Sequence, residues 1–273
     1  MYGYIQQGTT HGRILYLNGE IAYTSTAEEL KDALTGEDET IFVKLGADID
    51  IPISSLGSIT PGSGEYKLGG ENTKNITIDL NGKKLNITTT YWSNLGAKND
   101  DATFTIKNGT MTSSQETGTW NSYDLCFSNC NYVIEDVVFD KAISFGNANK
   151  NVSLKNVTIN ETHDYYAMWI EAVGQTVTID GLTINSDGRG IKIDEQYVGT
   201  PAKVTLKVSN STFDTANKSA IIVKSAAGAD IQLNNIDINK VNADKVNAVW
   251  VDADAAAYAN LGTVSGGTKI VEP

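Results

Sequence analysis

A motif that recurs seven times constrains the fold of this chain more than any other feature. In each copy, a bulky apolar residue is followed two positions later by Asn, Asp or Gly, and three positions after that by another apolar residue. Glycine adopts left-handed backbone angles without a Cβ penalty, and Asn and Asp adopt them more readily than other residues. Each copy therefore predicts a corner between two short strands. The predicted corner residues are Gly82, Asn108, Asp136, Asn156, Gly181, Asn210 and Asn235.

A second row of short apolar segments repeats together with the corners, which lie 20 to 29 residues apart. A period of this length predicts stacked structural repeats. Alternation along a strand places the outer residues of each segment in a core and directs its central residue towards solvent. The segments are Leu125-Cys126-Phe127, Ile143-Ser144-Phe145, Met168-Trp169-Ile170, Ile191-Lys192-Ile193, Ile221-Ile222-Val223 and Val249-Trp250-Val251.

Each predicted coil has three strands: one of these segments and one strand on either side of a corner, such as residues 152–154 and 157–159. Coils whose equivalent strands stack in parallel form a β-helix, here with about eight coils spaced roughly 4.8 Å apart. On these repeats, residues 39–253 resemble the right-handed β-helix of the pectin-lyase-like superfamily. The predicted fold class is therefore all-β, a right-handed single-stranded parallel β-helix with a short N-terminal capping helix.

The ends of such a solenoid need caps, because terminal coils otherwise expose apolar core and unpaired strand edges. Residues 26–38 are predicted to form a capping helix and turn, since they begin with the capping-box pattern Thr-Ala-Glu-Glu and continue with apolar residues at helical spacing. Residues 254–273 are predicted to form the C-terminal cap, with a final strand at 268–271. Residues 1–25 fit neither part, and we expect an edge hairpin or an attachment segment there.

The composition disfavours several kinds of partner. The net charge of −12 over 273 residues argues against nucleic acid and anionic membrane surfaces, which both need clustered Lys and Arg. No run approaches the roughly 18 apolar residues that span a bilayer, so we expect no membrane insertion. Cys126 and Cys130 are too few for a disulfide framework and have no nearby zinc ligands in the sequence. They are predicted to be free thiols or a local disulfide, and no metal or cofactor is expected.

The N-terminal residues lack the basic and apolar regions of a secretory signal. We expect either a virion component that is released by lysis or a bacterial surface protein whose signal was removed. Both alternatives place the protein outside the cell, on a virion surface or on a bacterial cell surface.

Stacking of the segments would bring outward side chains from remote parts of the chain into ladders about one strand spacing apart. One ladder contains two tryptophans and a lysine, and the next contains two carboxylates and a second lysine. In pectin-lyase-like enzymes the equivalent face binds polysaccharide, so the resemblance implies a glycan ligand here. A protein partner or a covering loop is the alternative. The candidate binding residues are Trp169, Glu171, Lys192, Asp194, Lys224 and Trp250.

We predict a non-enzymatic structural or ligand-displaying β-helix, either a fibre or decoration component of a phage virion or a surface adhesin, that assembles as a homo-oligomer such as a trimer. The alternative is a secreted carbohydrate-active enzyme of gut-type bacteria, a polysaccharide lyase or glycoside hydrolase. In that enzyme, Glu171 and Asp194 would be the paired carboxylates and Lys192 a base. The polygalacturonase-like signature is not found, because Asn99-Asp100-Asp101 is out of context and residues 189–192 contain an inserted Gly.

Overall fold

The computed structural model is an all-β parallel β-solenoid with 64% of its residues in strands and one short helix. This confirms the predicted fold class, although the number of coils is about six rather than the predicted eight. Residues 23–56, 65–88, 94–114, 125–146, 150–161, 166–215 and 220–238 are described in full, and outside these ranges only the backbone of short strands is described. The chain forms two compact units, Met1–Val137 and Val138–Pro273.

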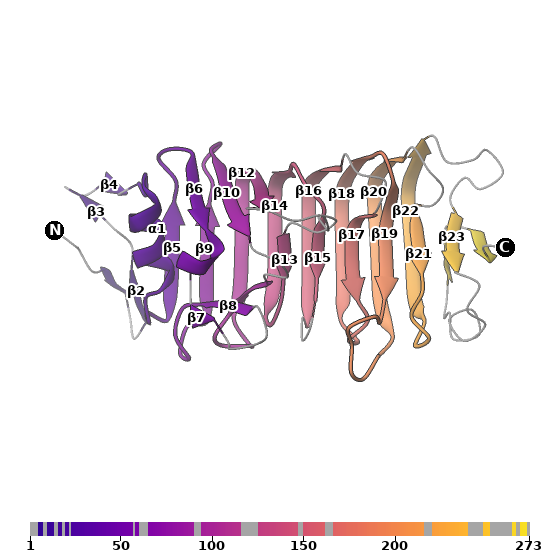
Figure 1. Cartoon of the computed structure of the whole chain (residues 1–273), viewed down its shortest axis with the longest axis horizontal. Coiled ribbons are helices and arrows are strands. Elements are labelled where there is room, and N and C mark those ends of the chain that lie inside the picture. Colours follow the sequence, from indigo (N-terminus) through magenta and orange to yellow (C-terminus); the bar gives the residue numbers. More distant parts are fainter. Residues whose placement is uncertain are drawn as a thin grey trace. The chain divides into compact units, whose positions relative to one another are not determined.

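Unit 1 contains the helix, α1 (Ala27–Leu34), which packs against its first parallel strands (Figure 1). The hydroxyl of Thr26 accepts the N–H of Glu29 at 3.2 Å, and the Glu29 carboxylate accepts the N–H of Thr26 at 3.1 Å. This reciprocal capping box satisfies two backbone donors that the first turn leaves unpaired. Leu30 and Leu34 are fully buried. The predicted helix therefore forms at the expected place and presents its apolar face to the core.

Parallel strands make up most of unit 1. One sheet runs in the order β2-β5-β9-β12-β14, with β10 paired to β6 and β12, and a second runs β8-β11-β13. Within residues 1–25, β1 and β2 pair antiparallel, and so do β3 and β4. The strands are β1 (Ile5–Gln7), β2 (Thr10–Arg13), β3 (Tyr16–Leu17), β4 (Glu20–Ile21), β5 (Thr40–Lys44), β6 (Ile49–Pro52), β7 (Ser58–Ile59), β8 (Glu65–Leu68), β9 (Asn75–Asp79), β10 (Lys84–Thr89), β11 (Asn94–Ala97), β12 (Thr103–Gln115), β13 (Leu125–Phe127) and β14 (Asn131–Phe139), with a 3₁₀ turn at Ile53–Ser55.

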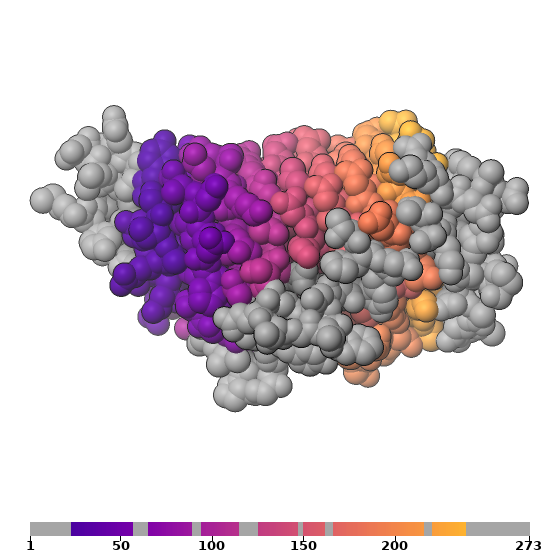
Figure 2. Space-filling view, turned by 45° about the horizontal axis from the view of Figure 1, so that its top comes forward, coloured from indigo at the N-terminus to yellow at the C-terminus, as the bar shows by residue number. Residues whose placement is uncertain are grey.

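Unit 2 is likewise built from two parallel sheets, whose coils appear as successive bands from pink to orange in Figure 2. One sheet runs β16-β18-β20-β22-β24, and the other runs β15-β17-β19-β21-β23-β25. The last strand occupies the predicted residues 268–271. The strands are β15 (Ile143–Phe145), β16 (Asn151–Glu161), β17 (Tyr166–Glu171), β18 (Thr176–Ser186), β19 (Arg189–Asp194), β20 (Val204–Thr215), β21 (Ile221–Val223), β22 (Ala229–Asn239), β23 (Ala248–Val251), β24 (Val264–Ser265) and β25 (Thr268–Val271).

All seven predicted corner residues have positive φ, between 50° and 78°. The sequence rule for the corners is thus confirmed at every copy. Most of them lie inside one long strand rather than between two separate ones, because the ladder resumes immediately after the bend. Lys155 pairs with Asp180 before the bend, for example, and Val157 pairs with Leu182 after it.

Side-chain amides link the corners of adjacent coils in unit 2. Asn235 Nδ2 donates to Asn210 Oδ1 at 2.8 Å, and Asn210 Nδ2 donates to Asp180 Oδ1 at 2.7 Å. Hydrogen bonds from Asn210 and Ser209 lower the pKa of the exposed Asp180 carboxyl. Asparagine therefore has two roles at a corner, since it tolerates the left-handed angle and also bonds to the next coil.

Gly181 occupies a corner where an added Cβ would displace the side-chain amide of Asn156. Its φ is +78°, and an added Cβ would lie 2.8 Å from Asn156 Oδ1. We expect Gly181→Ala to lower the free energy of unfolding by about 2 kcal/mol or more, because the backbone strain of a left-handed alanine adds to this contact. Gly82→Ala is the matched control, since its φ is +74° and a Cβ would meet nothing within 4 Å. Urea denaturation that gave equal losses for the two variants would contradict the role of the Asn156 contact.

Candidate functional site

The central residues of the short strands are buried in the five strands whose side chains are described, and for these the prediction that they point to solvent is wrong. In unit 2, Ser144, Trp169, Lys192 and Ile222 stack in register and are 8, 4, 3 and 1% exposed. In unit 1, Cys126 is also buried. Alternation along a strand determines which residues share a face, but it does not reveal what covers that face. The alternative expectation, a covered tryptophan, agrees with the structure at Trp169.

Lys192 lies at the centre of a charged and aromatic cluster on β17 and β19. Its Nζ forms an ion pair with Asp194 Oδ2 and lies 3.5 Å from the centroid of the Trp169 ring and 5.1 Å from that of Tyr166. Burial lowers the pKa of Lys192, and the hydrogen bond from its ammonium group to Asp194 opposes this effect. The aromatic faces and Asp194 together offset part of the cost of burying the ammonium group.

Both carboxylate oxygens of Asp194 are engaged. Oδ2 contacts Lys192, and Oδ1 accepts the backbone N–H of Glu195 at 2.8 Å. Asp194 is the register partner of Glu171 on the adjacent strand, so their Cα atoms are separated by roughly one strand spacing, about 4.8 Å. The two carboxylates that the sequence pairs are therefore neighbours.

Glu171 is the unusual acid of this cluster. Glu171 is only 7% exposed, and its Oε2 has no hydrogen-bond partner. Desolvation raises the pKa of Glu171 to about 7; the backbone N–H of Tyr197 and the charge of Lys192 lower it, while the charge of Asp194 raises it. Near neutral pH, this carboxyl group is therefore able both to give and to accept a proton.

Three residues of this cluster were not among the predicted site residues: Tyr166, Arg189 and Tyr197. Tyr197 lies in the loop after β19, and its ring contacts Trp169 with centroids 6.0 Å apart. Arg189 places its guanidinium 5.1 Å from the Tyr166 ring centroid and donates to the Tyr166 hydroxyl at 3.3 Å. The sequence could have indicated Tyr166 as a site residue, because it lies two residues before a repeated segment. It could not have indicated Tyr197, because loop conformation does not follow the strand period.

The remaining predicted site residues are Lys224 and Trp250. Lys224 follows β21, donates its backbone N–H to Ile193 at 2.8 Å, and its charge contributes to lowering the pKa of Lys192. The backbone of Trp250 stacks in register between Ile222 and Ile270. The side chain of Trp250 lies outside the described residues, as does all of the loop residue His163.

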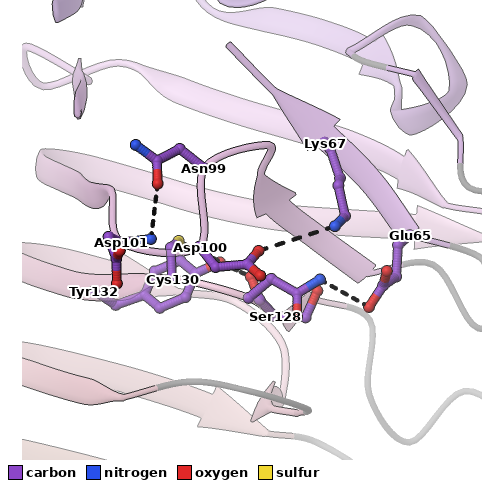
Figure 3. Close-up of polar contacts among 9 residues, drawn as sticks. Glu65, Lys67, Asn99, Asp100, Asp101, Ser128, Cys130 and Tyr132 are labelled. Carbon is purple, nitrogen blue, oxygen red and sulfur yellow. Dashed lines mark hydrogen bonds and ion pairs between the residues drawn. The ribbon is translucent and has the colours of Figure 1, made fainter. Parts of the chain in front are cut away.

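A second polar cluster lies in unit 1 around the end of β13 (Figure 3). Tyr132 is buried and places its hydroxyl 2.8 Å from the carbonyl oxygens of both Leu95 and Ser128. Cys126 and Cys130 are buried and form no disulfide, and burial raises the pKa of the Cys130 thiol to about 11. The predicted thiols are thus present, and the protonated Cys130 is a poor nucleophile.

Among the described residues, no helix has the length and apolar character needed to cross a membrane. No group of three or more His, Cys, Asp or Glu side chains in this part of the chain is arranged to hold a metal ion. Comparisons with protein-family models, with curated proteins and with solved structures found no match. Function must therefore be argued from the fold and from the clusters themselves.

Proposed function

We propose that this protein is a non-enzymatic β-helix that acts as a rigid structural or ligand-displaying element, as a virion fibre or decoration component or as a surface adhesin. The observation that carries this proposal is the closed cluster on β17 and β19. Lys192 forms an ion pair with Asp194 and contacts the Trp169 ring, and all three residues are at most 8% exposed. Two buried charges that bond to each other make the sheet around them more rigid. A catalytic pair of charged groups must instead be able to contact its substrate.

The same proposal places the chain in the pectin-lyase-like architecture, outside the cell and in a homo-oligomer such as a trimer. Parallel coils and Asn-rich corners support the architecture. Because the strands of one coil bond to the equivalent strands of the next, such a structure suits a protein that must resist unfolding and proteolysis. The solution mass, compared with 29.3 kDa for one chain, tests the oligomer.

A carbohydrate ligand would contact Tyr197 rather than Trp169. Two large aromatic side chains are exposed among the described residues, Tyr23 at 53% and Tyr197 at 49%. The Tyr197 ring packs on Trp169 and its hydroxyl accepts from the Gln196 side chain at 2.9 Å. Because its ring is already fixed by packing on Trp169, Tyr197 can present an apolar face to a sugar ring with little further loss of side-chain conformational entropy.

We expect Tyr197→Ala to weaken binding to a glycan selected on an array by roughly tenfold, the loss of one stacking contact of about 1.4 kcal/mol. Tyr23→Ala is the matched control, since that ring is exposed to the same degree and contacts Lys44 instead of Trp169. Equal affinities for the wild type and Tyr197→Ala, measured by titration calorimetry, would remove Tyr197 from the binding surface.

The alternative function, a carbohydrate-active enzyme, is favoured by one observation. Glu171 keeps its proton to about neutral pH beside Asp194, an arrangement that glycoside hydrolysis uses as acid and nucleophile. Reducing-sugar release from a panel of polysaccharides, present in the wild type and lost in Glu171→Gln, would support the enzyme and overturn the structural proposal.

A further inference from the structure

The three charged residues of the cluster have the arrangement that amide formation between a lysine and an aspartate requires. The nucleophile would be Nζ of Lys192, which contacts the Asp194 carboxylate. Lys192 as a whole is 3% exposed. Burial and the charge of Lys224 both lower the pKa of Lys192. A desolvated lysine loses its proton more easily than an exposed one, and the free amine is the nucleophilic form.

The Asp194 carboxyl group is held as an electrophile. Oδ1 accepts the N–H of Glu195 at 2.8 Å, whereas Oδ2 faces Lys192. A fixed backbone donor stabilises the negative charge that develops on Oδ1 when a nucleophile adds to Cγ. Oδ2 is then the oxygen that leaves.

Glu171 lies on the neighbouring strand and interacts electrostatically with both reacting groups, since the charge of Asp194 raises its pKa and that of Lys192 lowers it. It is the register partner of Asp194 on β17, it is buried, and its Oε2 has no hydrogen-bond partner. The pKa of Glu171 is raised to about 7 mainly by desolvation. The rings of Trp169 and Tyr166, which lie against Lys192 Nζ, help to keep water away from the reacting atoms.

We propose that Lys192 and Asp194 condense to an intramolecular amide bond, with Glu171 as the proton-transfer residue. A proton first moves from the Lys192 ammonium group to Asp194 Oδ2, which it contacts, and leaves a free amine beside a carboxylic acid. The lone pair of Nζ then adds to Cγ of Asp194, a C–N bond forms, and the bond from Cγ to Oδ2 breaks. Glu171 accepts a proton from the nitrogen and donates one to Oδ2, which leaves as water. The ammonium and carboxylate become one amide and one water, so the step balances without an oxidant, a reductant or a co-reactant.

Burial favours the product for a physical reason. A buried ion pair carries a desolvation penalty that the neutral amide does not have. The closed cluster also limits the return of water, which hydrolysis of the amide would need. The bond would be distinct from any glycan contact at Tyr197, because its reacting atoms belong to the largely buried side chains of Lys192 and Asp194.

The test is peptide mass analysis of the purified full-length chain after incubation at neutral pH and tryptic digestion. The peptide Gly190–Lys203 should lack the mass of one water and should remain uncleaved at Lys192, because trypsin does not cleave after an acylated lysine. The Asp-Gly pairs at Asp180 and Asp187, which can also lose water, lie outside this peptide. Hydroxylamine opens a cyclic imide at Asp194 and leaves an amide intact, so the loss should persist after this treatment.

Variants decide which atoms participate. Lys192→Arg and Glu171→Gln should show no loss of water and should be cleaved after residue 192. The matched control Lys207→Arg, on an exposed lysine of β20, should keep the loss in Gly190–Lys203. Asp194→Asn releases ammonia instead of water and should reach the same final mass as the wild type. A full-mass wild-type peptide that is cleaved at Lys192 overturns the proposal, and a condensed Glu171→Gln variant overturns the role of Glu171.

Discussion

Lys192→Met is expected to lower the free energy of unfolding by about 3–5 kcal/mol, the usual cost of removing one partner of a buried ion pair. The side chains of Lys192 and Asp194 are 4% and 12% exposed, so the Asp194 carboxylate would remain in a largely dry site with only the Glu195 N–H as a described donor. The variant also loses the contact of Nζ with the Trp169 ring, which adds to the cost. The loss is expected whether the two side chains form an ion pair or an amide.

The control for this prediction is Lys207→Met. Lys207 lies on β20 with an exposed side chain, and a surface substitution of this kind usually changes stability by at most about 0.5 kcal/mol. The double variant Lys192→Met with Asp194→Leu should recover much of the loss, because it removes the uncompensated carboxylate. Chemical denaturation is the measurement, and a Lys192→Met variant within about 1 kcal/mol of the wild type would show that the cluster is solvated.

The repeated parts of the fold could be predicted from the sequence because their physical cause is local. A left-handed corner needs Gly, Asn or Asp at that position, and all seven predicted residues have positive φ. The capping box at Thr26 and Glu29 is equally local, since both of its hydrogen bonds join residues three apart. Strand stacking then follows from the period, which brought Trp169 beside Lys192 and Glu171 beside Asp194.

The state of the candidate site could not be predicted in the same way. Exposure depends on what lies over a sheet, and Tyr197 reaches Trp169 from a loop that has no periodicity. The pKa of Glu171 is raised mainly by burial. This shift could not be predicted from a sequence interpretation that placed this face of the sheet in solvent. Sequence spacing therefore identified the neighbours correctly and their environment incorrectly.

Glu171→Gln is expected to abolish a pH dependence of stability of about 3 kcal/mol. The wild-type carboxyl has a pKa of about 7 when folded, against an ordinary value of 4.5 for a glutamate in the unfolded chain. Below pH 4.5 the group is protonated in both states, and its contribution to stability is fully present. As the pH rises through 7, the unfolded chain ionises first and stability is lost at about 1.4 kcal/mol per unit. Glutamine does not titrate, so this loss disappears.

The quantity to measure is the difference in unfolding free energy between Glu171→Gln and the wild type at several pH values. This difference should move by about 3 kcal/mol in favour of the variant between pH 4.5 and pH 8. The glutamine side chain also changes stability by an amount that is the same at every pH, and this constant offset does not affect the comparison. Glu71→Gln, at an exposed turn, controls for the general effect of removing one negative charge. If both differences stay flat across this range, Glu171 is ionised in a hydrated site, and its assignment as a proton carrier fails together with the closed cluster.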